Sequence, residues 1–278
     1  MAARRIAPVL IGLLVFATSC QLGGGGDLLS TIESRGRIVV ATDPAYPPQS
    51  EQLPDGTFEG FDIDVANEIG ERMGVDVEFA TPNFDEVVAG NWAGRFDISV
   101  GSVTITEERQ AVLDFTEAYY FTPAQFGATE ESGITDIEGI AGTTVCVGAA
   151  TTYQSWLEGS LTLVGSPEPD EPPENVEVTT FDTDTECADA IVAGRTDFEV
   201  WLTASETLKV AIDEGAPFVP VGDPVFFEAL AVAVDKEGPA HAELLEELDR
   251  IIAEMHEDGT LTELSQKWYD GQDLTKAE

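Results

Sequence analysis

The amino-acid sequence predicts an α/β protein made of two similar lobes. Three observations lead to this fold class: short β-rich runs alternate with amphipathic helical runs, the alternation occurs in two successive series, and one pentapeptide pattern recurs at the same place in each series. Such alternation is typical of a largely parallel sheet covered by helices. The length of 278 residues also exceeds what one small core requires, which favours two domains.

The first series begins with a β-rich run that predicts a strand at residues 37–41. Apolar residues then recur at helical spacing, which predicts a helix at residues 62–73. The remaining elements follow in order: a strand at 75–79, a helix at 84–91 and a strand at 96–100.

The second series repeats this order. It predicts strand, helix, strand, helix and strand at residues 143–147, 151–157, 176–181, 185–193 and 197–201. The pattern Ala-Gly-Arg-x-Asp occurs at residues 93–97 and again at 193–197, where it ends a helix with glycine and begins a strand. Five matching positions could arise by chance, but their equivalent places in the two series support a pair of similar lobes.

Two further segments complete the chain. Residues 165–174 are acidic and rich in proline, which predicts an exposed loop. Apolar residues at helical spacing predict an amphipathic helix over 244–255, and a second helix follows Gly259 and runs through Trp268. We expect both helices to pack on a lobe.

The N-terminus has the order of an export signal over residues 1–19: two arginines, an apolar run and small residues before Cys20. The apolar run is shorter than the roughly 20 residues of a membrane-spanning helix. Residues 17–20 resemble a bacterial lipobox, although alanine stands where leucine is usual, so we expect lipidation at Cys20 with plain secretion as the alternative. Residues 20–35 contain four consecutive glycines and are expected to form a flexible tether to the outer face of the cell membrane.

The chain is strongly acidic, with 53 acidic and 13 basic residues and a formal charge of −40. Removal of residues 1–19 would take away two arginines and give 11 − 53 = −42. A polyanion would be repelled by this field, which excludes nucleic acid as a partner. The acidity has two interpretations, solubility in high salt, which we favour, and a preference for cationic ligands.

Cysteine and histidine usage bounds the chemistry further. Cys146 and Cys187 form an even pair in an exported chain, so a disulfide is expected that closes a loop of about 40 residues; two free buried thiols are the alternative. His241 and His256 lie 15 residues apart without metal-ligand spacing. Neither a metal nor a cofactor is expected.

Three motifs match one known family in order. Residues 55–64 read Asp-Gly-Thr-Phe-Glu-Gly-Phe-Asp-Ile-Asp, residues 104–109 read Thr-Ile-Thr-Glu-Glu-Arg ahead of Asp-Phe-Thr at 114–116, and residues 258–268 run from Asp-Gly-Thr to Lys-Trp. Through these motifs the chain resembles the family 3 periplasmic solute-binding proteins, which are type II, two-lobed binders of polar amino acids. The resemblance covers nearly the whole chain after the N-terminal segment.

The resemblance implies how the chain is organised and what it does. Lobe 1 would comprise residues 36–125 and the returning segment 229–278, and lobe 2 residues 126–228. The ligand would lie in the cleft between them, where topology alone also places one, at the carboxyl ends of the strands. The implied function is capture of a small polar, amino-acid-like solute by a monomeric binding subunit, which closes on the solute and delivers it to the permease of an ABC importer.

In the resembling proteins an arginine at the position of Arg109 holds the ligand's α-carboxylate with a bidentate fork, whereas a surface ion pair is the alternative role. Gly101 would offer a backbone group, and Ser102 and Thr104 would offer hydroxyls; ordinary turn chemistry is the alternative.

Five further residues are expected at the ligand, two from their place at a helix start and three from the same resemblance. Thr151 and Thr152 begin a predicted helix and would point donors at an anion, although simple N-capping explains them almost equally well. Tyr46 and Phe84 match aromatic residues that sandwich the ligand side chain, with core packing as the alternative. Asp43 matches a position that contacts side-chain ends in binders of basic amino acids.

The sequence departs from the family at the ammonium site. Many relatives carry a carboxylate after the lobe 2 Gly-Arg-x-Asp strand, but residues 198–203 read Phe-Glu-Val-Trp-Leu-Thr. Trp201 falls at about that position, with Glu199 two residues earlier. Trp201 could hold a methylated ammonium by cation–π contact, and a buried core tryptophan is an equally good interpretation.

Two other functional classes remain for comparison. Some proteins of this fold are dehydratases, so an enzyme acting on a small carboxylate is the alternative function, with Glu199 or Glu228 as the available acid or base. The sequence contains no G-x-S-x-G, HExxH or phosphate-binding glycine loop. A receptor's sensing module would need a transmembrane segment after Trp268, and none follows. The sequence does not identify the solute.

Overall fold

The computed structural model describes residues 26–276. The predicted signal peptide at 1–19 and the lipidation of Cys20 lie outside these residues. Residues 28–35, which the sequence analysis assigned to the tether, instead form a helix, α1 (Leu28–Arg35). Asp27 caps its first turn by accepting a hydrogen bond from the backbone of Ser30, and Leu28 and Ile32 are buried one turn apart.

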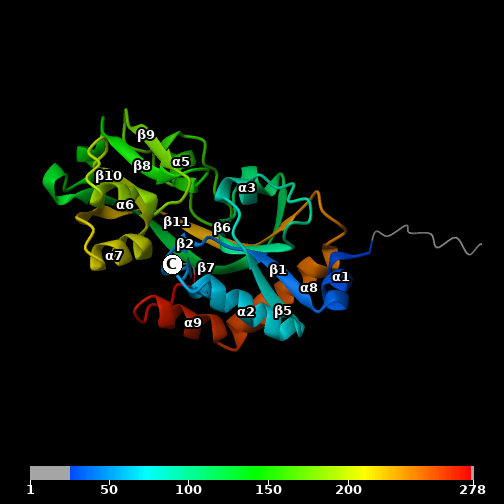
Figure 1. The fold of residues 1–278 in the computed structure, drawn as a ribbon. Helices are drawn as coiled ribbons and strands as arrows, with labels where there is room; N and C mark the ends of the chain where they lie inside the picture. Colours follow the sequence, from blue (N-terminus) through cyan, green and yellow to red (C-terminus); the bar gives the residue numbers. More distant parts are fainter. Residues whose placement is uncertain (1–25, 277–278) are drawn as a thin grey trace, which may run out of the picture.

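An eight-stranded mixed sheet runs through the whole molecule (Figure 1). Its strands stand in the order β5-β1-β6-β11-β7-β10-β8-β9. Their bounds are β1 Arg37–Ala41, β5 Asp76–Ala80, β6 Ile98–Thr104, β7 Leu113–Thr129, β8 Thr144–Gly148, β9 Glu177–Phe181, β10 Val200–Ala204 and β11 Phe218–Asp235. Strands β5, β1 and β6 pair in parallel at one end, and β10, β8 and β9 pair in parallel at the other.

The long strands β7 and β11 connect the two ends of the sheet. They pair with each other antiparallel, β11 also pairs with β6, and β7 also pairs with β10. The parallel units predicted from the sequence are therefore present, but the sheet as a whole is mixed. The predicted lobe boundaries at residues 125/126 and 228/229 fall inside β7 and β11 respectively.

Helices cover the sheet at both ends (Figure 1). The remaining helices are α2 Phe61–Met73, α3 Phe84–Val88, α4 Glu107–Gln110, α5 Thr152–Leu157, α6 Glu186–Val192, α7 Ser205–Asp213, α8 Ala242–Glu257 and α9 Thr260–Trp268, with 3-10 turns at Glu130–Ser132 and Ile137–Ile140. A small antiparallel sheet consists of β2 Ala45–Tyr46, β3 Ser50–Gln52 and β4 Phe58–Glu59. Residues 165–174 have no regular secondary structure and no buried residue, as predicted.

Separate hydrophobic cores form at the two ends of the sheet. At the β1 end, Ile38 and Phe61 belong to one core with Leu248 and Ile251 of α8, so this C-terminal helix packs on the first half of the fold. At the β8 end, Val145, Trp156 and Leu202 belong to a second core. We call these halves lobe 1 and lobe 2. Two cores joined by shared strands confirm the predicted two-lobed α/β fold class.

The predicted disulfide is present. Cys146 of β8 and Cys187 of α6 are bonded to each other, and both are fully buried. The bond ties a strand of lobe 2 to the helix that covers it. Within residues 26–276 no helix has both the length and the apolar content needed to cross a membrane.

Candidate functional site

A cleft between the two lobes brings together most of the predicted ligand-binding residues. Side chains reach it from β6 and α4 of lobe 1, from the β8–α5 connection and the end of β9 in lobe 2, and from β11. The lining residues are Asp43, Tyr46, Phe84, Gly101, Ser102, Thr104, Arg109, Gly148, Ala149, Thr151, Thr152, Tyr153, Asp182, Asp184, Glu228 and Leu230. Nine of the ten predicted ligand-binding residues are among them, and Trp201 is not.

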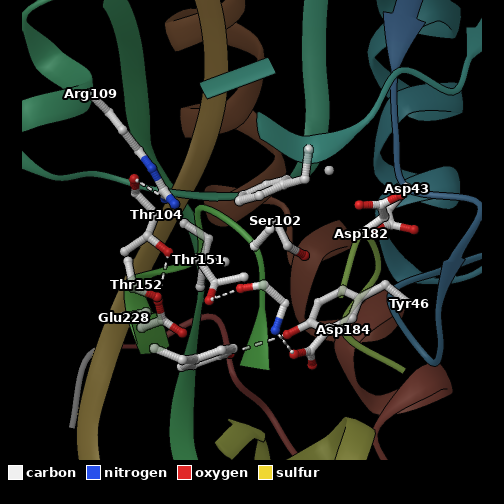
Figure 2. Close-up of a pocket in the computed structure, with 16 residues that line it drawn as sticks. Asp43, Tyr46, Ser102, Thr104, Arg109, Thr151, Thr152, Asp182, Asp184 and Glu228 are labelled. Atoms are coloured by element: carbon white, nitrogen blue, oxygen red, sulfur yellow. Dashed lines mark hydrogen bonds between the residues drawn. The ribbon is translucent and has the colours of Figure 1, made fainter. Parts of the chain in front are cut away.

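Arg109 is the one arginine or lysine among the lining residues (Figure 2). Thr106 caps α4 and fixes the backbone of Arg109, whose side chain is only 6% exposed. The guanidinium donates hydrogen bonds to the carbonyl oxygens of Thr104 and Ala150, and each N···O distance is 3.0 Å. Its Cζ lies 5.2 Å from the centre of the Phe84 ring.

Arg109 keeps its charge and most of its donors. Burial lowers its pKa to about 10, and the charge of Glu228 opposes that shift. The side chain is therefore cationic at neutral pH. A guanidinium has five N–H groups, and beyond the two carbonyl bonds the other three have no partner within residues 26–276.

Glu228 of β11 lies on the same side of the cleft as Arg109. It accepts hydrogen bonds from two hydroxyls that were predicted to bind the ligand. Thr104 Oγ1 of lobe 1 donates to Glu228 Oε1 over 2.7 Å, and Thr152 Oγ1 of lobe 2 donates to the same oxygen. A hydroxyl has one proton to donate, so neither is free for a ligand carboxylate in this arrangement. Burial raises the pKa of Glu228, whereas the two hydroxyls and Arg109 act in the opposite direction.

Ser102 is also engaged within the protein. Its backbone has a φ of 53°, in the left-handed region, which non-glycine residues adopt at a cost and often at functional sites. Its hydroxyl donates to the fully buried carboxyl of Asp62 over 2.7 Å and lies 2.6 Å from the hydroxyl of Tyr120. Tyr119 donates to the other oxygen of Asp62 over 2.8 Å.

Thr151 acts as the N-cap of α5, which was the alternative to its role at the ligand. Its hydroxyl accepts a hydrogen bond from the backbone of Gln154 and donates one to the carbonyl oxygen of Gly148 at a distance of 2.8 Å.

Aromatic side chains from both lobes also line the cleft. The hydroxyls of Tyr46 in lobe 1 and Tyr153 in lobe 2 are 3.2 Å apart, so the two lobes touch here.

Three aspartates lie away from Arg109 at the other side of the cleft: Asp43, Asp182 and Asp184 (Figure 2). Asp43 accepts a hydrogen bond from the backbone of Ala45 over 2.7 Å, and burial raises its pKa. Asp182 is exposed at the rim.

Asp184 is the most firmly held of the three and is only 5% exposed. It accepts hydrogen bonds from the backbone of Gly148 over 3.1 Å and from the side chain of Thr203. A Cβ at Gly148 would lie 3.2 Å from the Cα of Asp184, so glycine permits this close approach. Burial raises the pKa of Asp184 to about 7, and the charge of Asp43 adds to the shift.

Trp201 lies behind the cleft wall, contrary to the expected ligand contact. Its side chain is fully buried and packs in a lobe 2 core with Phe198 and Phe218. Its indole N–H points to Asp184, 3.4 Å from Oδ1. A strand residue whose ring fills the core cannot stack on a solute, so cation–π binding by Trp201 is not supported. Glu199, its predicted neighbour, does not line the cleft either.

Four charged or aromatic lining residues were not predicted from the sequence as ligand-site residues: Tyr153, Asp182, Asp184 and Glu228. Glu228 had been named only as an available acid or base. For two of the four a signal was present. Asp182 and Asp184 directly follow the predicted strand at 176–181, and the carboxyl ends of parallel strands form the ligand edge of such a sheet. Glu228 lies within β11, a long strand that the sequence did not reveal.

Residues 38–271 match the family model of the bacterial extracellular solute-binding proteins, family 3. The chain belongs to this family. The L-cystine-binding protein TcyJ of Escherichia coli is 28% identical over 270 residues, which cover 96% of this chain and 95% of that protein. The L-arginine-binding protein of Pseudomonas aeruginosa is 28% identical over 248 residues, covering 87% of this chain and 91% of that protein.

Solved structures agree with the family. The crystal structure of AncCDT-1, described as an ancestral amino acid-binding protein and a precursor of cyclohexadienyl dehydratase, superposes with a TM-score of 0.73 at 27% identity and covers 87% of this chain and 99% of that one. The family and its named relatives are binding proteins, so this family 3 chain is a binding protein rather than an enzyme. Within residues 26–276 no three His, Cys, Asp or Glu side chains are grouped as metal ligands.

Proposed function

We propose that this family 3 protein captures a small polar, amino-acid-like solute in the cleft between its lobes and delivers it to the permease of an ABC importer. The observation that carries the proposal is Arg109, a buried guanidinium that lines the cleft and has three N–H groups without a partner in the described part of the chain. A planar fork of this kind matches the geometry of a carboxylate. Two named relatives bind L-cystine and L-arginine, which supports an amino acid as the solute class.

The ligand carboxylate, in this proposal, is held by Arg109 and backbone N–H groups rather than by the threonine hydroxyls. Thr104 and Thr152 do not contact the ligand carboxylate, because both donate their hydroxyl protons to Glu228 from opposite lobes. Closure of the lobes brings these two hydroxyls onto one carboxylate oxygen, so the closed state is stabilised as the solute is enclosed. We retain lobe 1 as residues 36–125 and 229–278 and lobe 2 as residues 126–228.

We further propose that the protein works outside the cell membrane as a monomer, anchored through acylated Cys20 once residues 1–19 are removed. The order of charged, apolar and small residues before Cys20 supports this location, as does membership of an extracellular family.

A thermal-shift screen of the purified protein against the common amino acids tests the proposed function. A ligand that binds only the folded state stabilises it by RT ln(1 + [L]/Kd), about 2.7 kcal/mol at a hundredfold excess over Kd. We expect at least one amino acid to raise the melting temperature and to be recovered chemically unchanged after prolonged incubation. Failure of every amino acid to stabilise the protein, or conversion of the stabilising one, would contradict the proposal.

A further inference from the structure

Charge is distributed unequally along the cleft. The lining residues include four carboxylates, Asp43, Asp182, Asp184 and Glu228, against the one guanidinium of Arg109, so the formal sum is 1 − 4 = −3. Figure 2 shows Arg109 and Glu228 on one side of the cleft, and Asp43, Asp182 and Asp184 on the other. A ligand that spans the cleft therefore meets a cation at one end and several carboxylates at the other.

The charge of Glu228 does not contribute to the excess of negative charge at the aspartate end of the cleft. Both threonine hydroxyls are committed to it, and the charge of Arg109 offsets its own. The three aspartates have no such compensation. No lysine or arginine of the described chain lies within ion-pair distance of Asp43, Asp182 or Asp184.

The partners of the aspartates leave room for a ligand. Within residues 26–276, Asp43 accepts one side-chain hydrogen bond, from the backbone N–H of Ala45, and Asp182 accepts none. Asp184 is held by Gly148, Thr203 and the indole of Trp201, which fix its orientation. Trp201 is therefore a positioning residue for Asp184 instead of a ligand contact.

General acidity of the surface does not account for this cluster. Acidic residues that keep a protein soluble lie in water, where their charges cost little. Asp184 is 5% exposed and Asp43 is half-buried, and a buried carboxylate without a counter-charge is costly. Burial raises the pKa of both, and the charge of Asp43 adds to the shift of Asp184, which is the behaviour of anions that lack a cation.

We infer that the solute carries a cationic side chain besides its amino-acid group, and that Asp43, Asp182 and Asp184 bind the positive charges while Arg109 binds the carboxylate. This inference rests on the proposed function and specifies the substrate class as a basic amino acid such as arginine, lysine or ornithine. Tyr46 and Phe84 also line the cleft and would pack on the aliphatic part of the side chain.

Isothermal titration of the purified protein with L-arginine and with L-citrulline, its neutral analogue of nearly the same shape, tests the inference. A carboxylate left without its cationic partner in a buried site weakens binding strongly, so we expect L-citrulline to bind roughly 10²-fold more weakly than L-arginine. Asp43→Asn should weaken L-arginine binding by about tenfold or more and leave L-citrulline binding little changed, whereas Asp182→Asn, at the exposed rim, should weaken L-arginine binding less.

Asp76→Asn is the matched control. It removes the same charge from an exposed position on β5 that does not line the cleft, so both affinities should stay as in the wild type. Equal affinity for L-arginine and L-citrulline, or a loss in Asp76→Asn as large as in Asp43→Asn, would overturn the inference and leave the proposed function standing. Binding of no amino acid, charged or neutral, would contradict both.

Discussion

At the scale of single residues, burial sets the chemistry around the cleft, and Asp62 is the clearest case. Its carboxyl is fully buried in α2, accepts hydrogen bonds from Ser102 and Tyr119, and has a pKa raised to about 7 by burial. The ordinary value is 3.8, so between these two pH values the folded protein holds a proton that the unfolded chain has lost. The contribution of Asp62 to the free energy of unfolding therefore falls as pH rises through this window.

Asp62→Asn should remove that decline, because an amide cannot ionise. Relative to the wild type, the variant is expected to gain roughly 2–4 kcal/mol of unfolding free energy between pH 4.5 and pH 8, on top of a pH-independent offset from altered hydrogen bonds. Urea denaturation at the two pH values measures the change. Asp76→Asn, which removes an exposed charge, should show a much smaller change, and an equal change in both variants would refute the role given to Asp62.

At the scale of elements, periodicity predicted the short strands and helices of both lobes but not the connections between them. Strands β7 and β11 carry Pro123 and Pro220 and shift register against each other at several points. Such strands lack a steady two-residue alternation, so the sequence gives no clear signal for them. The predicted strand at 197–201 begins later, at Val200, because Gly194 and the ion pair of Arg195 with Asp197 belong to the preceding turn.

The candidate site was predictable where family motifs carry it and not where folding brings distant segments together. Arg109 and Thr104 belong to one motif, and the cleft indeed contains both. Asp184 reaches the cleft from the loop that follows β9. The ammonium-binding carboxylate was expected at about Trp201, where the side chains are buried in the core instead. Which loop supplies the acid depends on the packing of β9 against β8 and β10, which is a tertiary property.

The disulfide is an element-scale feature with a measurable effect. It links β8 to α6 across a separation of 41 residues, and loop-closure entropy for this length corresponds to about 4 kcal/mol. The Cys146→Ala/Cys187→Ala double variant should lose about this much unfolding free energy in urea denaturation, and reduction of the wild-type protein should give a similar loss. An unchanged urea midpoint in both would show that the bond does not stabilise the fold.

At the scale of the whole molecule, the two lobes touch through contacts that surround the cleft. The hydroxyls of Tyr46 and Tyr153 meet across it, and Thr185 of lobe 2 donates to the carbonyl oxygen of Ala45 in lobe 1 over 2.9 Å. Arg109 adds its bond to the carbonyl oxygen of Ala150. These bonds join the lobes around the cationic and acidic ends of the cleft, and the long strands β7 and β11 run between the two lobes.

In the proposed function, Arg109 holds the carboxylate of an amino-acid solute between the lobes. Calorimetric titration of Arg109→Lys with the amino acid that stabilises the wild type most tests it directly. Lysine keeps the charge but loses the fork, so we expect the affinity to fall by roughly 10²-fold, with urea denaturation confirming a folded variant. Wild-type affinity in a folded Arg109→Lys protein would contradict the account.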